Sequence, residues 1–147
     1  MPLPRPAEIA LKVAGPGGGL AETSAVHALG LTTQVPSVDV IAVPGRAPKP
    51  VKGTRFVSRS IERRIHGLTP LEIAVVEVLR LGPTEVEAPW STVETLIRTL
   101  ISDQKVRLET IALQVPHEHH SGTRERWNDV SVPLGAQHPR IVSSVHP

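Results

Sequence analysis

Residues 70–81 carry apolar side chains at helical spacing and predict the best-defined helix of the chain. The apolar residues recur three or four positions apart, at Leu71, Ala74, Val75, Val78 and Leu79. Thr69 and Glu72 stand three residues apart with a proline between them, which is the pattern of a capping box that has proline at the first helical position. Gly82 and Pro83 then end the run. We therefore expect a capped helix over 70–81.

A second apolar stripe of the same kind follows Ser91. Its members again lie at helical spacing, at Val93, Leu96, Ile97, Leu100 and Ile101. Ser91 and Glu94 repeat the capping pattern, which predicts that this helix begins at Ser91. A third helix is predicted over residues 103–113, with Val106 and Ile111 facing the core.

The first half of the chain predicts shorter elements that glycine and proline separate. Short helices are expected over 7–14 and 20–29, and we interpret the glycine-rich residues 15–19 between them as a flexible connection. The β-branched residues of 38–43 predict a strand. Residues 50–60 alternate around a central glycine and predict a β-hairpin with a cationic outer face.

Together these elements predict an α+β fold, in which several short helices pack on a small antiparallel β-sheet. We assign this domain to residues 4–114. Beyond Val115 no apolar period is sustained and helix breakers are frequent, so residues 115–147 are expected to form a flexible tail. Trp127 and the apolar residues of 140–145 are exceptions, and either is expected to dock onto the domain or onto a partner.

Composition narrows the classes of protein that remain. The 147 residues include no cysteine and only 2% aromatic residues, which excludes disulfides, thiol nucleophiles and cysteine-ligated zinc, and leaves an aliphatic core. No apolar run approaches the roughly 20 residues that cross a bilayer. The first residues carry too short an apolar run, interrupted by Glu8, for a secretion signal. We expect a cytoplasmic protein with no membrane association.

Three motifs suggest chemistry, and each has a simpler interpretation. The sequence HEHH at 117–120 has the side chains of a metal site, but it lies in the predicted tail, where no fold orients the ligands. The glycines of 15–19 lack the Gly-Lys-Ser/Thr of a phosphate-binding loop. No serine lies in a Gly-x-Ser-x-Gly elbow. We therefore predict no enzymatic activity, no cofactor, no specific metal site and no small-molecule substrate.

The charge pattern gives the strongest candidate for a binding surface. Residues 46–64 contain seven cations and a single acid, followed by an acidic block over 71–103. The cations are Arg46, Lys49, Lys52, Arg55, Arg59, Arg63 and Arg64. Three interpretations stay open: a solvated face, a surface for an acidic protein partner, and a strip for nucleic acid phosphates.

The segment AETSAVHALGLTTQVPSVDVIAVPGRAPKPVKGTRFVSRS, residues 21–60, resembles the second domain of the AbiEi-like antitoxins of bacterial type IV toxin–antitoxin systems. In that family a short alanine-rich helix leads into Leu-Gly-Leu-Ser/Thr-Thr-Gln and a proline, followed by a strand, a basic hairpin and helices. The matching residues here are Leu29, Gly30, Leu31, Thr32, Thr33, Gln34 and Pro36. The likeness extends over about residues 4–113.

The resemblance implies a non-enzymatic antitoxin that binds and neutralises a nucleotidyltransferase-type toxin through protein–protein contact. Family members usually begin with a winged helix-turn-helix domain that binds operator DNA, and the likeness starts after that domain. The alternatives are therefore a DNA-associated regulator of its own operon and a truncated remnant of one. For Thr32, Thr33 and Gln34 we expect hydrogen bonds to the helix end and the sheet edge, with direct contact to the toxin as the other possibility.

Overall fold

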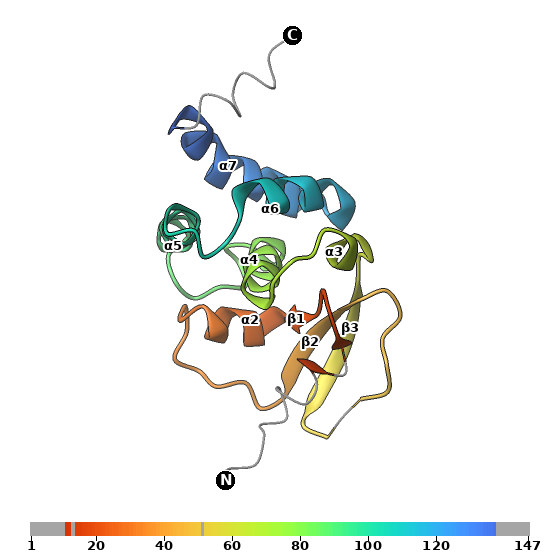
Figure 1. Ribbon diagram of the computed structural model, residues 1–147. Coiled ribbons are helices and arrows are strands. Elements are labelled where there is room, and N and C mark those ends of the chain that lie inside the picture. Colours follow the sequence, from red (N-terminus) through yellow and green to blue (C-terminus); the bar gives the residue numbers. More distant parts are fainter. Residues whose placement is uncertain (1–10, 13, 51, 138–147) are drawn as a thin grey trace.

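The helix α4 (Pro70–Leu81) runs through the middle of the molecule (Figure 1). The β-sheet and α2 (Glu22–Ala28) lie on one side of it, and the C-terminal helices lie on the other. The structure is a computed structural model that describes residues 11–12, 14–50 and 52–137. All side chains from 72 to 79 are buried, so α4 is enclosed on every side and not only along the predicted stripe.

The predicted capping box at the start of α4 is confirmed. The backbone N–H of Glu72 donates to the Thr69 hydroxyl at 3.2 Å, and the Glu72 carboxylate accepts from the backbone N–H of Thr69 at 2.9 Å. Two of the N–H groups that a helix start leaves unpaired are thereby satisfied. Glu72 also accepts from the Arg107 guanidinium at 2.8 Å, so the box fastens α4 to the segment that precedes α6 (Leu108–Gln114).

The sheet is small, as predicted, but it is mixed. Strand β1 (Gly19–Leu20) pairs antiparallel with β2 (Asp39–Pro44), while β3 (Thr54–Arg59) pairs parallel with β2 along its whole length. The predicted hairpin over 50–60 is therefore wrong. Two neighbouring parallel strands need a connection that brings the chain back to the end of the sheet where the first strand begins. Residues 45–53 provide this connection. Residue 51 lies outside the described part of the chain.

The glycine cluster at 15–19 is a packed segment and not the flexible connection that we predicted. A Cβ on Gly19 would lie 2.7 Å from Ile73 Cγ2, and one on Gly17 would lie 2.8 Å from the Arg64 backbone. Gly17 also has φ +83°, which other residues rarely adopt. These positions let the chain pass close to α4 and α3 (Glu62–Ile65). Of the helix predicted over 7–14, most residues lie outside the described part.

The two helices after α4 exist, but their starts differ from the prediction. Helix α5 (Trp90–Ser102) begins after Pro89, whose carbonyl accepts from the backbone N–H of Thr92 and of Val93. Ser91 consequently falls inside the first turn and does not cap the helix. Helix α6 (Leu108–Gln114) starts later than 103, because the chain turns at Gln104 with φ +61°. Val106 and Ile111 are buried, as predicted.

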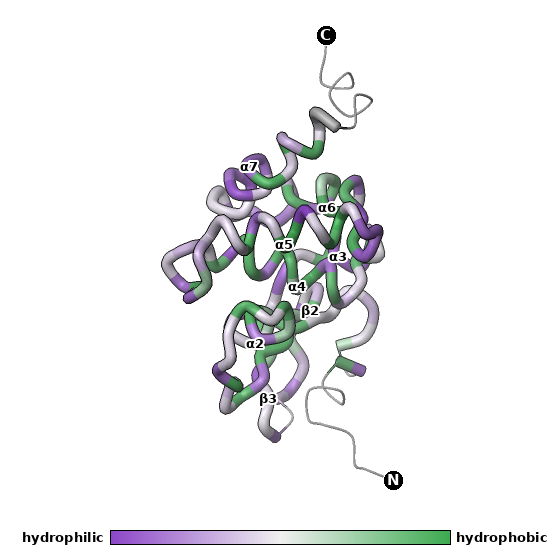
Figure 2. The backbone as a smooth tube through the Cα atoms, turned by 90° about the vertical axis from the view of Figure 1, so that its left-hand side faces the viewer, coloured by the Kyte–Doolittle hydropathy of each residue, from purple (hydrophilic) through white to green (hydrophobic). Residues whose placement is uncertain are grey.

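Residues 115–118 and 121–137 are helical, which corrects the tail predicted over 115–147. A 3₁₀ turn η1 (Val115–Glu118) leads into α7 (Ser121–Gln137), and residues 138–147 lie outside the described part. The side chains of Trp127, Val130 and Leu134 belong to the main hydrophobic core, so the predicted docking of Trp127 is confirmed. The hydrophobic segments of α2, α4 and α5 that share this core are green in Figure 2.

Helix α7 is fastened to the end of α4 by one arginine. Arg126 Nη1 donates to the carbonyl oxygens of Leu79 and Arg80, at 2.7 and 3.2 Å. These carbonyls belong to the last turn of α4, where a cation is favourable. A Cβ on Gly82 would lie 2.4 Å from the guanidinium carbon, so only glycine leaves room for this contact.

The proline inside α7 is compensated by an arginine of α5. Pro133 has no N–H, so it leaves the Asp129 carbonyl, four residues earlier, without its helical donor. Arg98 Nη2 donates to that oxygen at 3.0 Å, and Arg98 Nε donates to the Val130 carbonyl at 3.1 Å. The two helices are thus joined where the helix ladder of α7 is interrupted. Taken together, these elements confirm the predicted α+β class.

Replacing Thr69 by alanine is expected to lower the free energy of unfolding by about 1 kcal/mol, because the capping hydroxyl is lost. Chemical denaturation measures this change. Thr95→Ala, at an exposed position of α5, is the matched control and should be neutral or slightly stabilising. Equal effects of the two substitutions would show that the box does not stabilise α4.

A double-mutant cycle tests the compensation at Pro133. Arg98→Met should cost about 1 kcal/mol in the natural chain, because a helix carbonyl loses its donor. The same change should cost less in Pro133→Ala, since the new N–H supplies that donor. Strict additivity of the two changes in denaturation experiments would contradict this account.

Candidate functional site

The structure separates the seven cations of residues 46–64 into structural and exposed groups. Arg63 has an exposed fraction of 0% and Arg59 is largely covered, so neither belongs to an outer basic face. Arg64 donates to the carbonyls of Pro16 and Ala14, at 2.9 and 3.2 Å, and holds the glycine-rich segment. The prediction that all seven cations form a single strip is therefore wrong, because the strand that carries some of them leads into the protein interior.

The two covered arginines, Arg59 and Arg63, pair with two glutamates in the interior. We call Arg59, Arg63, Glu77 and Glu118 the ion cluster. Arg63 Nε and Nη2 donate to the two oxygens of Glu118 at 2.9 and 2.6 Å, and Nη2 also donates to Glu77 at 2.8 Å. Arg59 donates to Glu77 through Nε and Nη2, at 2.9 and 3.2 Å. The four residues come from β3, α3, α4 and η1, so the cluster joins the sheet to the C-terminal helices.

Pairing overcomes the cost of burying these charges. Burial alone would raise the pKa of Glu118, but the hydrogen bonds and charge of Arg63 and the Gln114 amide outweigh it and lower that pKa. Burial alone would likewise lower the pKa of Arg63, and its contacts with Glu118 and Glu77 raise it instead. Both groups are therefore charged in the folded protein at neutral pH. Removing one partner would leave the other as an uncompensated buried charge.

The remaining cations lie at the surface. Arg55 is half exposed and pairs with Glu22 at 2.7 Å, a contact that solvent screens strongly. Arg46, Lys49 and Lys52 are exposed and lie in the connection between β2 and β3. We call these three residues the basic loop, and they are what remains of the predicted strip as a free cationic surface.

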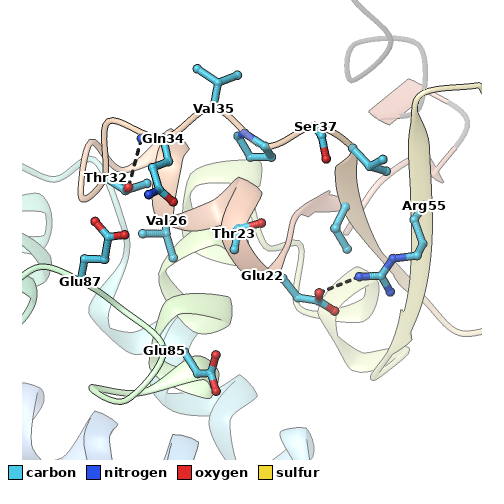
Figure 3. Close-up of a pocket in the computed structure, with 13 residues that line it drawn as sticks. Glu22, Thr23, Val26, Thr32, Gln34, Val35, Ser37, Arg55, Glu85 and Glu87 are labelled. Atoms are coloured by element: carbon cyan, nitrogen blue, oxygen red, sulfur yellow. Dashed lines mark hydrogen bonds and ion pairs between the residues drawn. The ribbon is translucent and has the colours of Figure 1, made fainter.

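A groove of about 410 Å³ opens beside α2, and the motif that carries the family resemblance forms one wall of it (Figure 3). Thr32, Gln34, Val35 and Pro36 belong to that wall. The Thr32 hydroxyl accepts from the backbone N–H of Gln34 at 3.2 Å, which closes a local turn. The expected bonds from the triplet to the helix end and the sheet edge are not formed among the described residues. Thr33 and Gln34 are exposed instead.

The groove combines exposed apolar side chains with unpaired acids. Val35 is 73% exposed and Val38 is 43% exposed, both on the loop between α2 and β2. Glu85 and Glu87 line the groove from the loop between α4 and α5, and within the described chain neither forms an ion pair. In Figure 3 these carboxylates lie across from Gln34, while Val35 projects away from α2. The groove therefore suits a ligand that is apolar and cationic.

Sequence reasoning did not identify Val35, Val38, Glu85 or Glu87 as site residues. The acids belong to the segment GPTEVEAP, which was interpreted only as part of an acidic block. Their position opposite the Thr-Thr-Gln turn depends on the packing of α2 against α4, which no local pattern encodes.

The HEHH motif at 117–120 is divided among separate contacts. Glu118 belongs to the ion cluster, His120 Nδ1 accepts from the backbone N–H of Thr123 at 3.1 Å, and His117 lies 3.8 Å from the Glu62 carboxylate. In the part of the chain that the structure describes, no group of three histidine, cysteine or carboxylate residues is arranged to hold a metal ion.

The ion cluster makes stability depend on pH in a defined direction. A carboxylate whose pKa is lowered by folding stabilises the protein above its unfolded pKa, and this contribution is lost as the pH falls through the lowered value. The pKa of Glu118 is lowered, so we expect stability to fall as the pH drops below roughly 4.3, the ordinary value for glutamate. Denaturation at a series of pH values measures the slope.

Glu118→Gln should reduce that acid slope and also cost about 3–5 kcal/mol at pH 7, because Arg63 stays buried with one partner fewer. Glu125→Gln, at an exposed position of α7, is the control and should change neither quantity. An unchanged slope in Glu118→Gln would show that the cluster does not set the acid response.

The chain matches no protein-family model, no curated protein and no solved structure. Within the described residues, no helix is both long enough and apolar enough to span a membrane. The resemblance of residues 21–60 to the AbiEi-like antitoxins therefore remains a prediction. The groove and the charges that stay free at the surface are the features of the chain that bear on its function.

Proposed function

We propose that this chain is a non-enzymatic, antitoxin-like binding protein that neutralises a nucleotidyltransferase-type toxin by protein–protein contact. The observation that carries the proposal is that three residues of the motif, Thr32, Gln34 and Pro36, line the groove. The same residues carry the resemblance to the antitoxin family.

The chemistry of the groove supports a partner segment that is basic and apolar. Exposed valines gain free energy when a partner covers them, at about 25 cal/mol per Å² of apolar surface. Glu85 and Glu87 complement cations and would orient the partner. The contact surface proposed here is therefore the groove, in place of the seven-residue basic strip that the sequence indicated.

The alternative, a DNA-associated regulator, has the basic loop as its support. Arg46, Lys49 and Lys52 are exposed cations, and each phosphate that such a residue neutralises makes DNA binding more sensitive to salt. Four of the seven predicted cations are engaged with other residues of the chain, at Arg55, Arg59, Arg63 and Arg64. The favourable electrostatic contribution to binding duplex DNA is correspondingly reduced, so we rank this function second.

Co-purification with the product of the neighbouring gene, which the proposal expects to be a nucleotidyltransferase-type toxin, tests the proposal. The natural chain should form a stable complex and restore growth to cells that express the toxin. Val35→Asp should weaken the complex at least about tenfold, because it replaces apolar surface that the partner would cover with a charge that would have to lose its hydration. The measurement is a titration of the purified partner.

Val132→Asp is the matched control, since this valine is 67% exposed on α7. It should bind as the natural chain does. Replacing all three residues of the basic loop by glutamine separates the two candidate surfaces. A complex that only this triple variant weakens would move the contact to the basic loop, and absence of any complex together with salt-sensitive binding to duplex DNA would favour the regulator.

A further inference from the structure

A second set of cationic side chains lies next to the ion cluster, whose two glutamates already pair with Arg59 and Arg63. Arg80 follows Glu77 by three residues on α4, so the two side chains lie on the same face of the helix. Arg126 reaches the Arg80 carbonyl from α7, and His120 lies at the start of that helix. Arginines from β3, α3 and α4 thus share two carboxylates, those of Glu77 and Glu118.

Hydrogen-bond donors exceed acceptors at this place. All four oxygens of Glu77 and Glu118 already accept from Arg59, Arg63 or Gln114. Arg63 Nη1 is nevertheless buried without a partner. Unpaired buried donors are rare in folded proteins, because each costs the desolvation of an N–H group. The neighbourhood therefore lacks an acceptor.

The lack of a hydrogen-bond acceptor is clearer still at Arg80. Its side chain is half-buried, and its guanidinium forms no hydrogen bond or ion pair with any described residue. Burial, followed by the positive charge of Arg59, lowers the pKa of Arg80. The pKa of His120 is lowered as well, by burial and then by Arg80 and Arg126. Burial is thus the largest cause of both shifts, and the opposing charge of Glu118 does not offset it.

We propose that Arg80, with Arg59 and His120 beside it, binds a phosphate-type oxyanion. Arg59, Arg63 and Arg80 exceed Glu77 and Glu118 by one positive charge, which favours an anionic ligand. A guanidinium binds phosphate through two parallel N–H groups, and Arg80 has none of them engaged within the described chain. His120 Nδ1 accepts from Thr123, so the neutral ring carries its proton on Nε2 and adds a donor.

This site shares no residue with the lining of the groove. The oxyanion site therefore does not depend on the proposed antitoxin function. Variants at Val35 should leave oxyanion binding unchanged.

Titration of the full chain with inorganic phosphate at constant ionic strength tests the inference, with thermal unfolding and calorimetry as readouts. The natural chain should bind in a saturable way and unfold at a higher temperature than in matched chloride. Arg80→Gln should weaken the affinity at least about tenfold, the effect of losing one charge-assisted pair. Without phosphate this variant should unfold at the same temperature as the natural chain or a higher one, because it removes an unpaired, half-buried charge.

Arg124→Gln, an exposed arginine on α7, is the matched control and should bind phosphate as the natural chain does. Equal affinity for a nucleoside monophosphate would identify the ligand as phosphate alone, and tighter binding would identify it as part of a nucleotide. The inference is overturned if phosphate has no effect beyond that of chloride, or if Arg80→Gln binds phosphate as well as the natural chain.

Discussion

The pairing of buried Arg63 with Glu77 and Glu118 is the interaction on which the rest of the structure depends. Arg63 and Glu118 are 55 positions apart, and both side chains are almost fully excluded from water. Such charges are tolerated only when every partner is in place, since a charge buried alone costs several kcal/mol. The cluster therefore requires η1 to lie against α3 and α4, and it positions α7 so that Arg126 caps α4 and Trp127 enters the core.

The same constraint decides which residues remain available for function. By drawing Arg59 and Arg63 inward, the cluster removes the middle of what the sequence presents as a basic strip. The side chains that remain free to bind another molecule then lie in two other places. One is the acidic, valine-lined groove beside α2, and the other is the donor-rich neighbourhood of Arg80. Each has an excess of one sign of charge that the described chain does not neutralise, as expected of surfaces that bind an external group.

Local signals predicted the central elements well. The capping box at Thr69 and the β-branched run that forms β2 each specify structure within a few residues, and both are confirmed. Contacts between distant residues were not predictable in this way. Helix α7 buries about one side chain per turn, at Thr123, Trp127, Val130 and Leu134, and it contains Pro133. Its stripe is therefore narrow, and its stability comes from α5, α4 and the ion cluster. The parallel pairing of β3 with β2 likewise depends on a register that no turn motif in the sequence predicts.

Hydrogen exchange of the backbone amides of the natural chain tests the central claim most directly. If the ion cluster joins the C-terminal helices to the body, amides in the middle of α7 should be protected by a free energy close to that of α4, because the two helices open together. The account would be contradicted if the amides from about residue 124 to 134 exchanged as fast as those of an unfolded chain while α4 stayed protected. This region would then be a flexible tail.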